Sequence, residues 1–167
     1  MTRVVQPFKP EYRIEVRSGD KRISDIDAIW DKTAAQKLYA SVQAAFPGSR
    51  LTMSLPGGTW VEATTAEIDR VADVNAALAL AAILEVGLTR IDWTLAKYEP
   101  GEITGYARSR EVVAEYAKLL GKDVAEKVEG ERTRYVVKGV YRDVAVDVYC
   151  NVKNDQPASA DKAKAVA

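Results

Sequence analysis

Apolar and polar residues alternate in several short segments of the first third of the chain, which is the pattern of half-buried β-strands. Residues 12–17 alternate strictly, and a polar turn leads from them into a second alternating run at 25–31. A third run at 50–55 reaches Pro56-Gly57, a pair that suits the central positions of a type II turn, and an apolar segment follows at 59–63. The pattern therefore predicts two β-hairpins.

Two other segments carry apolar residues at helical spacing together with terminal signals. The first begins at Thr33–Gln36, which fits a capping box with the Thr33 hydroxyl at the N-cap, and it ends near Phe46, before a Pro-Gly pair. The second begins at Ser109, a candidate N-cap, and ends at Gly121, a residue suited to a left-handed C-terminal position. We predict one helix in each segment.

A third helix is predicted between these two, and its composition is unusual. It opens with a capping box at Thr64–Glu67 and should stop at Gly87. From Val74 to Leu84 it has no charged residue, and a helix that is apolar all round is usually enclosed on several sides. Its own fold or another subunit would provide that enclosure. The apolar stretch is about 16 Å long as a helix, against the roughly 30 Å of a bilayer core, so we expect no membrane span.

The last third of the chain is the clearest β region. Strands are predicted at 124–128, 133–141 and 144–152, after an earlier one at 90–96. A tight turn at Arg142-Asp143 pairs Tyr141 with Val144, Val137 with Val148 and Lys138 with Asp147, so apolar pairs fall on one face and an ion pair on the other.

Together these elements predict an α+β fold, with a largely antiparallel sheet and three helices packed on one face. The order of a helix followed by a β-hairpin occurs on both sides of the apolar central helix, which suggests two topologically similar halves. Residue identities do not support a true sequence repeat.

Composition fits one globular domain. Of the 167 residues, 47% are apolar and 29% are charged, and we assign 1–153 to a single domain. Residues 154–167 are rich in Ala, Lys and Asp, which predicts a flexible tail. Basic and acidic residues number 24 each, so the general basicity of a nucleic-acid-binding protein is missing.

Several classes of chemistry are excluded by composition. The chain has no histidine, which removes Ser-His-Asp, Cys-His and His-ligated zinc sites. The lone Cys150 forms no intramolecular disulfide, and it shares the apolar face of its strand, where a thiol is a poor nucleophile. With no apolar segment near the N-terminus to act as a signal peptide, a reducing cytoplasmic location is expected. We expect no cofactor.

A cluster of acids, Asp25, Asp27 and Asp31, has the ligand type that hard cations prefer but not the spacing of a calcium-binding loop. We therefore predict no metal site. A carboxylate-based hydrolase would need two facing acids, and the sequence does not identify a pair.

The predicted start of the helix at 109 is a candidate anion-binding site. Free backbone amides and the helix dipole favour an anion there, and guanidinium groups bind phosphate in bidentate fashion. The alternative interpretation is a simple N-cap with arginines that are solvated or paired with nearby glutamates. The candidate residues are Gly105, Arg108, Ser109 and Arg110.

A second candidate lies on the polar face of the strands in the last third, where basic side chains accompany an aromatic ring. Such a face can follow a phosphate backbone and stack bases. Asp147 opposite Lys138 weakens this hypothesis, since mixed charges are typical of any solvated sheet face. The candidate residues are Arg132, Arg134, Lys138, Arg142 and Tyr149.

The function that fits these observations best is a non-catalytic protein-interaction or assembly protein that acts through surface recognition. Its partner would be another protein or a second copy of the chain, which would make a homo-oligomer. The alternative is a protein that binds nucleic acid or a phosphorylated ligand through the arginine-lined strand face and the helix N-terminus.

Overall fold

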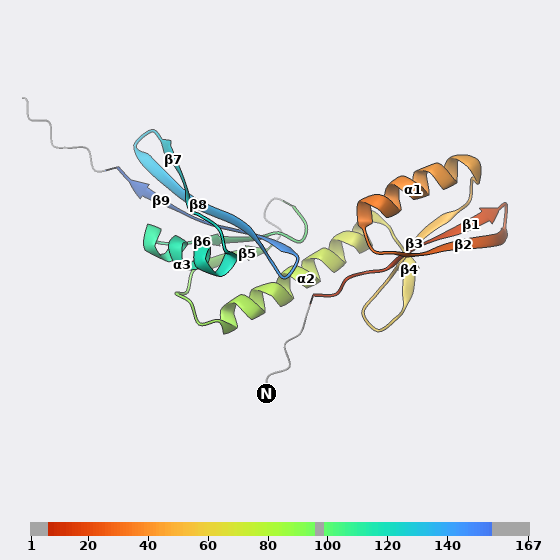
Figure 1. Cartoon of the computed structure of the whole chain (residues 1–167), viewed down its shortest axis with the longest axis horizontal. Helices are drawn as coiled ribbons and strands as arrows, with labels where there is room; N and C mark the ends of the chain where they lie inside the picture. The colour runs from red at the N-terminus through yellow and green to blue at the C-terminus, as the bar shows by residue number, and fades with distance from the viewer. Residues whose placement is uncertain (1–6, 96–98, 155–167) are drawn as a thin grey trace, which may run out of the picture.

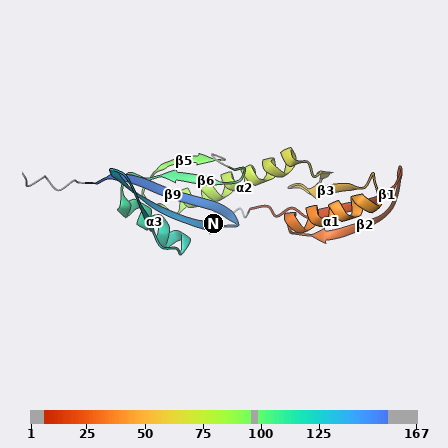
Figure 2. The ribbon, with the colours of Figure 1, turned by 90° about the horizontal axis from the view of Figure 1, so that it is seen from above.

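A computed structural model describes residues 7–95 and 99–154, which form three α-helices and nine β-strands (Figure 1). In chain order these are β1 (Tyr12–Ser18), β2 (Lys21–Ile29), α1 (Lys32–Ala45), β3 (Arg50–Ser54), β4 (Trp60–Glu62), α2 (Thr65–Glu85), β5 (Asp92–Leu95), β6 (Ile103–Tyr106), α3 (Arg110–Leu120), β7 (Ala125–Glu129), β8 (Arg132–Tyr141) and β9 (Val144–Lys153). The α+β class is confirmed. The strands divide between two sheets at opposite ends of an elongated molecule, and α2 runs from one sheet to the other (Figures 1 and 2).

The first sheet has the order β2-β1-β3-β4, with every neighbouring pair antiparallel. Both predicted hairpins are present, and the turn after β3 has Gly57 at φ 96° and a hydrogen bond from the Gly58 amide to the Leu55 carbonyl, as a type II turn requires. One face of the sheet packs against α1. The buried residues of this first core are Tyr12, Ile14, Val16, Ala35, Leu51, Met53, Ile68 and Val71.

A bulge in β2 explains why its alternation is imperfect. Tyr12 lies opposite Ile29 and Ile14 opposite Ile26, so three residues of β2 span two residues of β1. Ala28 takes up the extra length in a left-handed conformation, with φ 59°. Because of the inserted residue, Ile26 and Ile29 both pack against the first core although they are three residues apart.

The N-terminus of α1 differs from the predicted capping box. The N-cap is Asp31, whose Oδ1 accepts a hydrogen bond of 2.7 Å from the Ala34 amide, and the helix begins at Lys32. The prediction of Thr33 as the N-cap was therefore wrong by two positions. A carboxylate at Asp31 supplies a charge-assisted bond to the helix amides, which leaves Thr33 inside the first turn.

The second sheet has the order β5-β6-β9-β8-β7, so β9, the last strand along the described chain, lies in the middle. β6 and β9 are parallel, and the other pairs are antiparallel. The predicted register of β8 and β9 is confirmed at all three pairs, including Lys138 opposite Asp147. Arg142 and Asp143 both have positive φ, 50° and 63°, as the two central residues of a type I′ turn do.

Helices α2 and α3 pack against one face of this sheet. The second core draws on alternate positions of β8 and β9, on β6, and on both helices. Its buried residues are Ala76, Ala79, Ile83, Ile103, Ala107, Val113, Tyr116, Ala117, Leu120, Val137, Val144, Val146, Val148 and Cys150.

The central helix α2 belongs to both cores. The Thr64 hydroxyl caps it by accepting from the Glu67 amide at 3.2 Å, as the sequence predicts. Ile68 and Val71 enter the first core, while Ala76, Ala79 and Ile83 enter the second.

The assignment of 1–153 to one domain stays a prediction, and residues 155–167 of the expected tail lie outside the described residues.

The two assignments of the α1 cap lead to different mutational outcomes. Asp31→Ala removes the side-chain cap and should lower the free energy of unfolding by about 1 kcal/mol. Thr33→Ala should change it by less than about 0.5 kcal/mol, because Thr33 makes no cap contact and alanine has the better helix propensity. Urea titration followed by circular dichroism measures both, and a larger effect for Thr33→Ala would contradict the Asp31 cap.

Candidate functional site

Among the described residues, no helix packs on one face of the second sheet, because α2 and α3 both pack on the other face. We call this the outer face. It presents even-numbered residues of β8 and odd-numbered residues of β9, and it includes Tyr106 of β6, which lies opposite Tyr149 in the parallel pair. Two loop carboxylates, Glu99 and Glu102, border a shallow depression of about 580 Å³ at its edge, which also touches Arg134 and Lys138.

Aromatic and guanidinium groups form a row across the outer face. The Arg134 Cζ lies 4.4 Å from the centroid of the Tyr149 ring, and the Tyr106 ring meets the Tyr149 ring edge to face at 5.5 Å. Tyr106 is 40% exposed. Tyr106 was not predicted to lie on this face, because β6 is only four residues long and includes a glycine, so its sequence lacks a clear strand pattern.

Two basic side chains of the outer face are matched by carboxylates. The Lys138 Nζ lies 2.5 Å from Asp147 Oδ2, and the hydrogen bond from Lys138 to Asp147 raises the pKa of the lysine. Lys127 contacts Glu129 at 2.9 Å, and that hydrogen bond lowers the pKa of Glu129. Both lysines therefore have an acidic partner within the fold.

The remaining predicted residues separate into two groups. Arg134 lies against Tyr149, and Arg132 lies two residues away on the same face of β8. Within the described ranges no carboxylate is placed within 4.0 Å of either guanidinium. Arg142 lies in the turn after β8, with its guanidinium 5.5 Å from the Tyr141 ring. Since eight residues of strand extend about 27 Å, Arg142 is too far from Arg134 to share a small ligand with it.

The candidate anion site lies at the start of α3, where the predicted N-cap is confirmed. Ser109 is the N-cap, and its hydroxyl hydrogen bond to the Glu111 carboxylate is the main cause of the lowered pKa of Glu111. A carboxylate of the chain thus already uses a polar group at this helix end. The Arg110 guanidinium lies over the Tyr135 ring at 5.1 Å, and Arg108 is exposed.

Gly105 lies within β6 and is buried rather than positioned in a flexible loop. A Cβ at this position would lie 2.5 Å from Ile91 Cδ1 and 2.8 Å from the Trp93 ring. The glycine is therefore required for the close packing of β5 against β6. The role of Gly105, Arg108, Ser109 and Arg110 as an anion site stays a prediction without added support.

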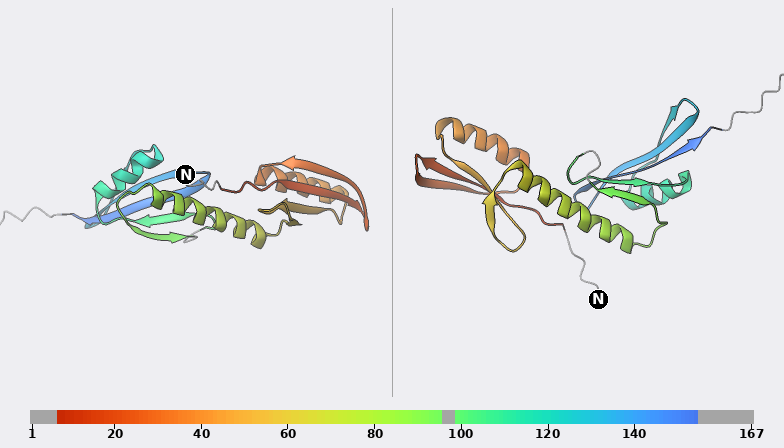
Figure 3. Two further views of the ribbon diagram at one scale, coloured as in Figure 1. Left: turned by 90° about the horizontal axis from the view of Figure 1, so that it is seen from below. Right: turned by 180° about the vertical axis from the view of Figure 1, so that it is seen from behind.

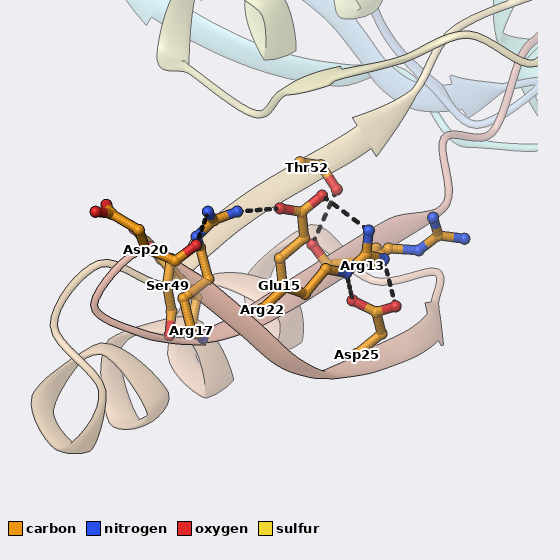
Figure 4. A network of polar contacts seen from close by, with 9 residues as sticks. Arg13, Glu15, Arg17, Asp20, Arg22, Asp25, Ser49 and Thr52 are labelled. Carbon is orange, nitrogen blue, oxygen red and sulfur yellow. Dashed lines mark hydrogen bonds and ion pairs between the residues drawn. The ribbon is translucent and has the colours of Figure 1, made fainter.

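The acidic cluster of the first sheet is taken up by local contacts, as Figure 4 shows for part of it. Asp25 binds Arg22, whose hydrogen bond lowers the pKa of the aspartate, and Asp27 lies 2.5 Å from Arg13. Asp31 caps α1. Among the residues with described positions, no group of three or more potential metal ligands comes together.

A second surface with functional character lies along α2. Val74, Ala77, Ala81 and Leu84 recur at intervals of three and four residues on the side opposite the buried Ala76, Ala79 and Ile83, and all four are exposed. We call these four residues the α2 row. Val74 is 45% exposed and Leu84 is 54% exposed. Figure 3 shows this helix lying open between the two sheets.

A hollow lies beside each end of the α2 row. The first, about 230 Å³, is lined by Val74 together with Phe8 and Leu55. The second, about 470 Å³, is lined by Leu84 together with Leu88 and other apolar side chains. Within the part of the chain that the structure describes, no helix is long and apolar enough to cross a membrane.

Comparison of the chain with known proteins found no matching family model, no similar curated protein and no similar solved structure.

The packing role of Gly105 can be tested by adding a single methyl group. Gly105→Ala should lower the free energy of unfolding by about 1–3 kcal/mol, because the new Cβ overlaps Ile91 and Trp93. Arg108→Ala, at an exposed position in the same segment, should change it by less than about 0.5 kcal/mol. Equal stability of the two variants in urea titration would show that Gly105 is not closely packed.

Cys150 is expected to behave as an inert core thiol. It is fully buried, and burial is the main cause of its raised pKa, so less thiolate is present at any given pH. At pH 8 a chromogenic disulfide reagent should react with the native protein orders of magnitude more slowly than with the protein unfolded in guanidinium chloride. A native rate equal to the unfolded rate would place the thiol at the surface.

Proposed function

We propose that this protein is a non-catalytic assembly protein that binds a second copy of itself through the α2 row. The observation that carries the proposal is the exposed apolar side of a helix whose opposite side is already buried in the second core. Exposed helix faces of monomeric proteins normally carry charged residues, and α2 has none between Asp73 and Glu85.

The shape of the α2 row favours pairing around a two-fold axis. Ala77 and Ala81 lie at its centre, and small side chains there allow two helix axes to approach closely. In an antiparallel pair, Leu84 of one copy would meet Val74 of the other, next to the hollow beside Val74. The two-fold rotation would thus cover both ends of the α2 row with side chains of the other copy.

Charges at the ends of α2 fit the same arrangement. Arg70 is exposed one turn before Val74, and Glu85 follows Leu84 directly. Antiparallel pairing brings Arg70 of one copy within side-chain reach of Glu85 of the other, which adds two ion pairs at the rim of the interface. Within its own helix Arg70 contacts Glu67 at 2.7 Å. In the dimer the Arg70 guanidinium would therefore contact both Glu67 of its own chain and Glu85 of the other copy.

A non-catalytic role is supported by the chemistry of the chain. Histidine is absent from the sequence, the single thiol is buried, and the clustered aspartates of the first sheet are bound to arginines or to a helix N-terminus. We keep the cytoplasm as the proposed location, because the one cysteine forms no intramolecular disulfide.

The assembly proposal is tested by the molar mass in solution. Light scattering on a size-exclusion column should give twice the chain mass for the wild-type protein, with dissociation on dilution. Leu84→Lys places a charge in the interface and should give the monomer mass at the same concentration. Circular dichroism should confirm that the variant is folded.

Leu38→Lys is the matched control. Leu38 is an exposed apolar residue of α1, with 39% of its surface exposed, and its replacement should leave the dimer intact. A wild-type protein that is monomeric at the highest attainable concentration would overturn self-assembly. Dissociation by Leu38→Lys to the same extent as by Leu84→Lys would move the interface away from α2.

A further inference from the structure

The outer faces of the two sheets differ in how their charges are matched. On the first sheet, each of three arginines contacts a carboxylate: Arg13 with Asp27, Arg17 with Glu15, and Arg22 with Asp25. Figure 4 shows the contacts of Arg17 with Glu15 and of Arg22 with Asp25, which a further contact between Arg22 and Glu15 joins into one network. This face therefore matches these three arginines within the fold, whereas Arg50 of β3 has no carboxylate within 4.0 Å among the described residues.

On the second sheet, basic side chains from three adjacent strands gather at one end of the outer face. Arg132 lies directly opposite Lys153, and Lys127 directly opposite Arg134. Like charges directly opposite one another destabilise a sheet. We call these four residues the basic cluster.

One carboxylate of the strands, Glu129, lies within this cluster. It is directly opposite Arg132 in the sheet, and its ion pair is with Lys127. Over the described residues, no acidic group comes within 4.0 Å of the charged atoms of Arg132, Arg134 or Lys153. Three positive charges are thus held close together without an acidic partner at contact distance. This arrangement is complementary to a ligand that carries several negative charges at regular spacing.

The aromatic row adjoins the basic cluster through Arg134. The guanidinium of Arg134 lies over Tyr149, and Tyr106 extends the row by one strand. Exposed aromatic rings and guanidinium planes are the groups on which unpaired bases stack. A ligand that offers only phosphate groups would make no stacking contact with Tyr106. A single-stranded nucleic acid would contact the basic cluster with its phosphates and the aromatic rings with its bases.

We propose that the outer face of the second sheet binds single-stranded nucleic acid, with phosphates on the basic cluster and bases against Tyr106 and Tyr149. Glu99, Glu102 and Asp147 limit the site on the other side, because carboxylates repel phosphates. The site is independent of the proposed assembly, since α2 covers the opposite face of this sheet.

The charge balance sets the expected strength of binding. The chain has no net charge, so the attraction is local and binding should be weak and sensitive to salt. With about three phosphates contacted, the logarithm of the association constant should fall with a slope of about −2 against the logarithm of salt concentration.

The probe is a fluorescently labelled oligothymidylate, with binding followed by anisotropy between about 50 and 200 mM salt. Arg132→Ala should weaken binding and reduce the magnitude of the salt slope by about 0.7, the contribution of one phosphate contact on a single strand. Tyr106→Leu should weaken binding about tenfold and leave the salt slope unchanged, because it removes stacking and no charge.

Arg50→Ala is the matched control, because Arg50 is an exposed strand arginine on the first sheet. It should bind as the wild-type protein does. Poly-glutamate, a polyanion without bases, should compete weakly with the oligonucleotide. Its affinity for the protein should not change in the Tyr106→Leu variant.

Three results would overturn the proposal. The first is no detectable binding at the lowest salt concentration. The second is binding that Arg132→Ala and Tyr106→Leu leave unchanged. The third is equal competition by poly-glutamate, which would point to an acidic protein partner for this face instead.

Discussion

The arrangement of the whole molecule depends on the burial of α2 in two separate hydrophobic cores. The helix is 21 residues long, or about 31 Å, and only part of this length packs against each sheet. Its first turns complete the core of the first sheet, and its later turns complete the core of the second. Because a single helix is shared, unfolding of α2 would remove side chains from both cores at once, although each of its buried side chains enters only one of them. The same sharing leaves one side of the helix exposed among the described residues, and that side is apolar.

Local pattern predicted most elements, because alternation and helical spacing are properties of neighbouring residues. The β8–β9 register was also predictable, since it depends on one tight turn and on chemically matched pairs such as Lys138 and Asp147. The division of the strands into two sheets was not evident, because it depends on pairings between distant segments. β6 lacked alternation, and Asp31 competed with Thr33 as a cap through a charge that the capping-box pattern does not include.

The residues of the outer face of the second sheet were also only partly predictable from the sequence. Arg132, Arg134 and Tyr149 were placed on one face by the two-residue period and the hairpin register. Tyr106 was not, because it joins them only through the parallel pairing of β6 with β9. The neutral total charge concealed a further property: acids and bases are paired on the first sheet, whereas one end of the second sheet concentrates bases.

The central place of β9 governs the order in which the chain can fold as it is synthesised. The strands of the first sheet, and the α2 residues that complete its core, all precede residue 72, so this sheet can form early. The β5–β6 hairpin and α3 emerge later but have no central strand to join until β9 leaves the ribosome. During that interval the apolar residues of β6 and α3 that contact β9 in the finished fold stay exposed. The second half of the protein is therefore the part that would engage chaperones.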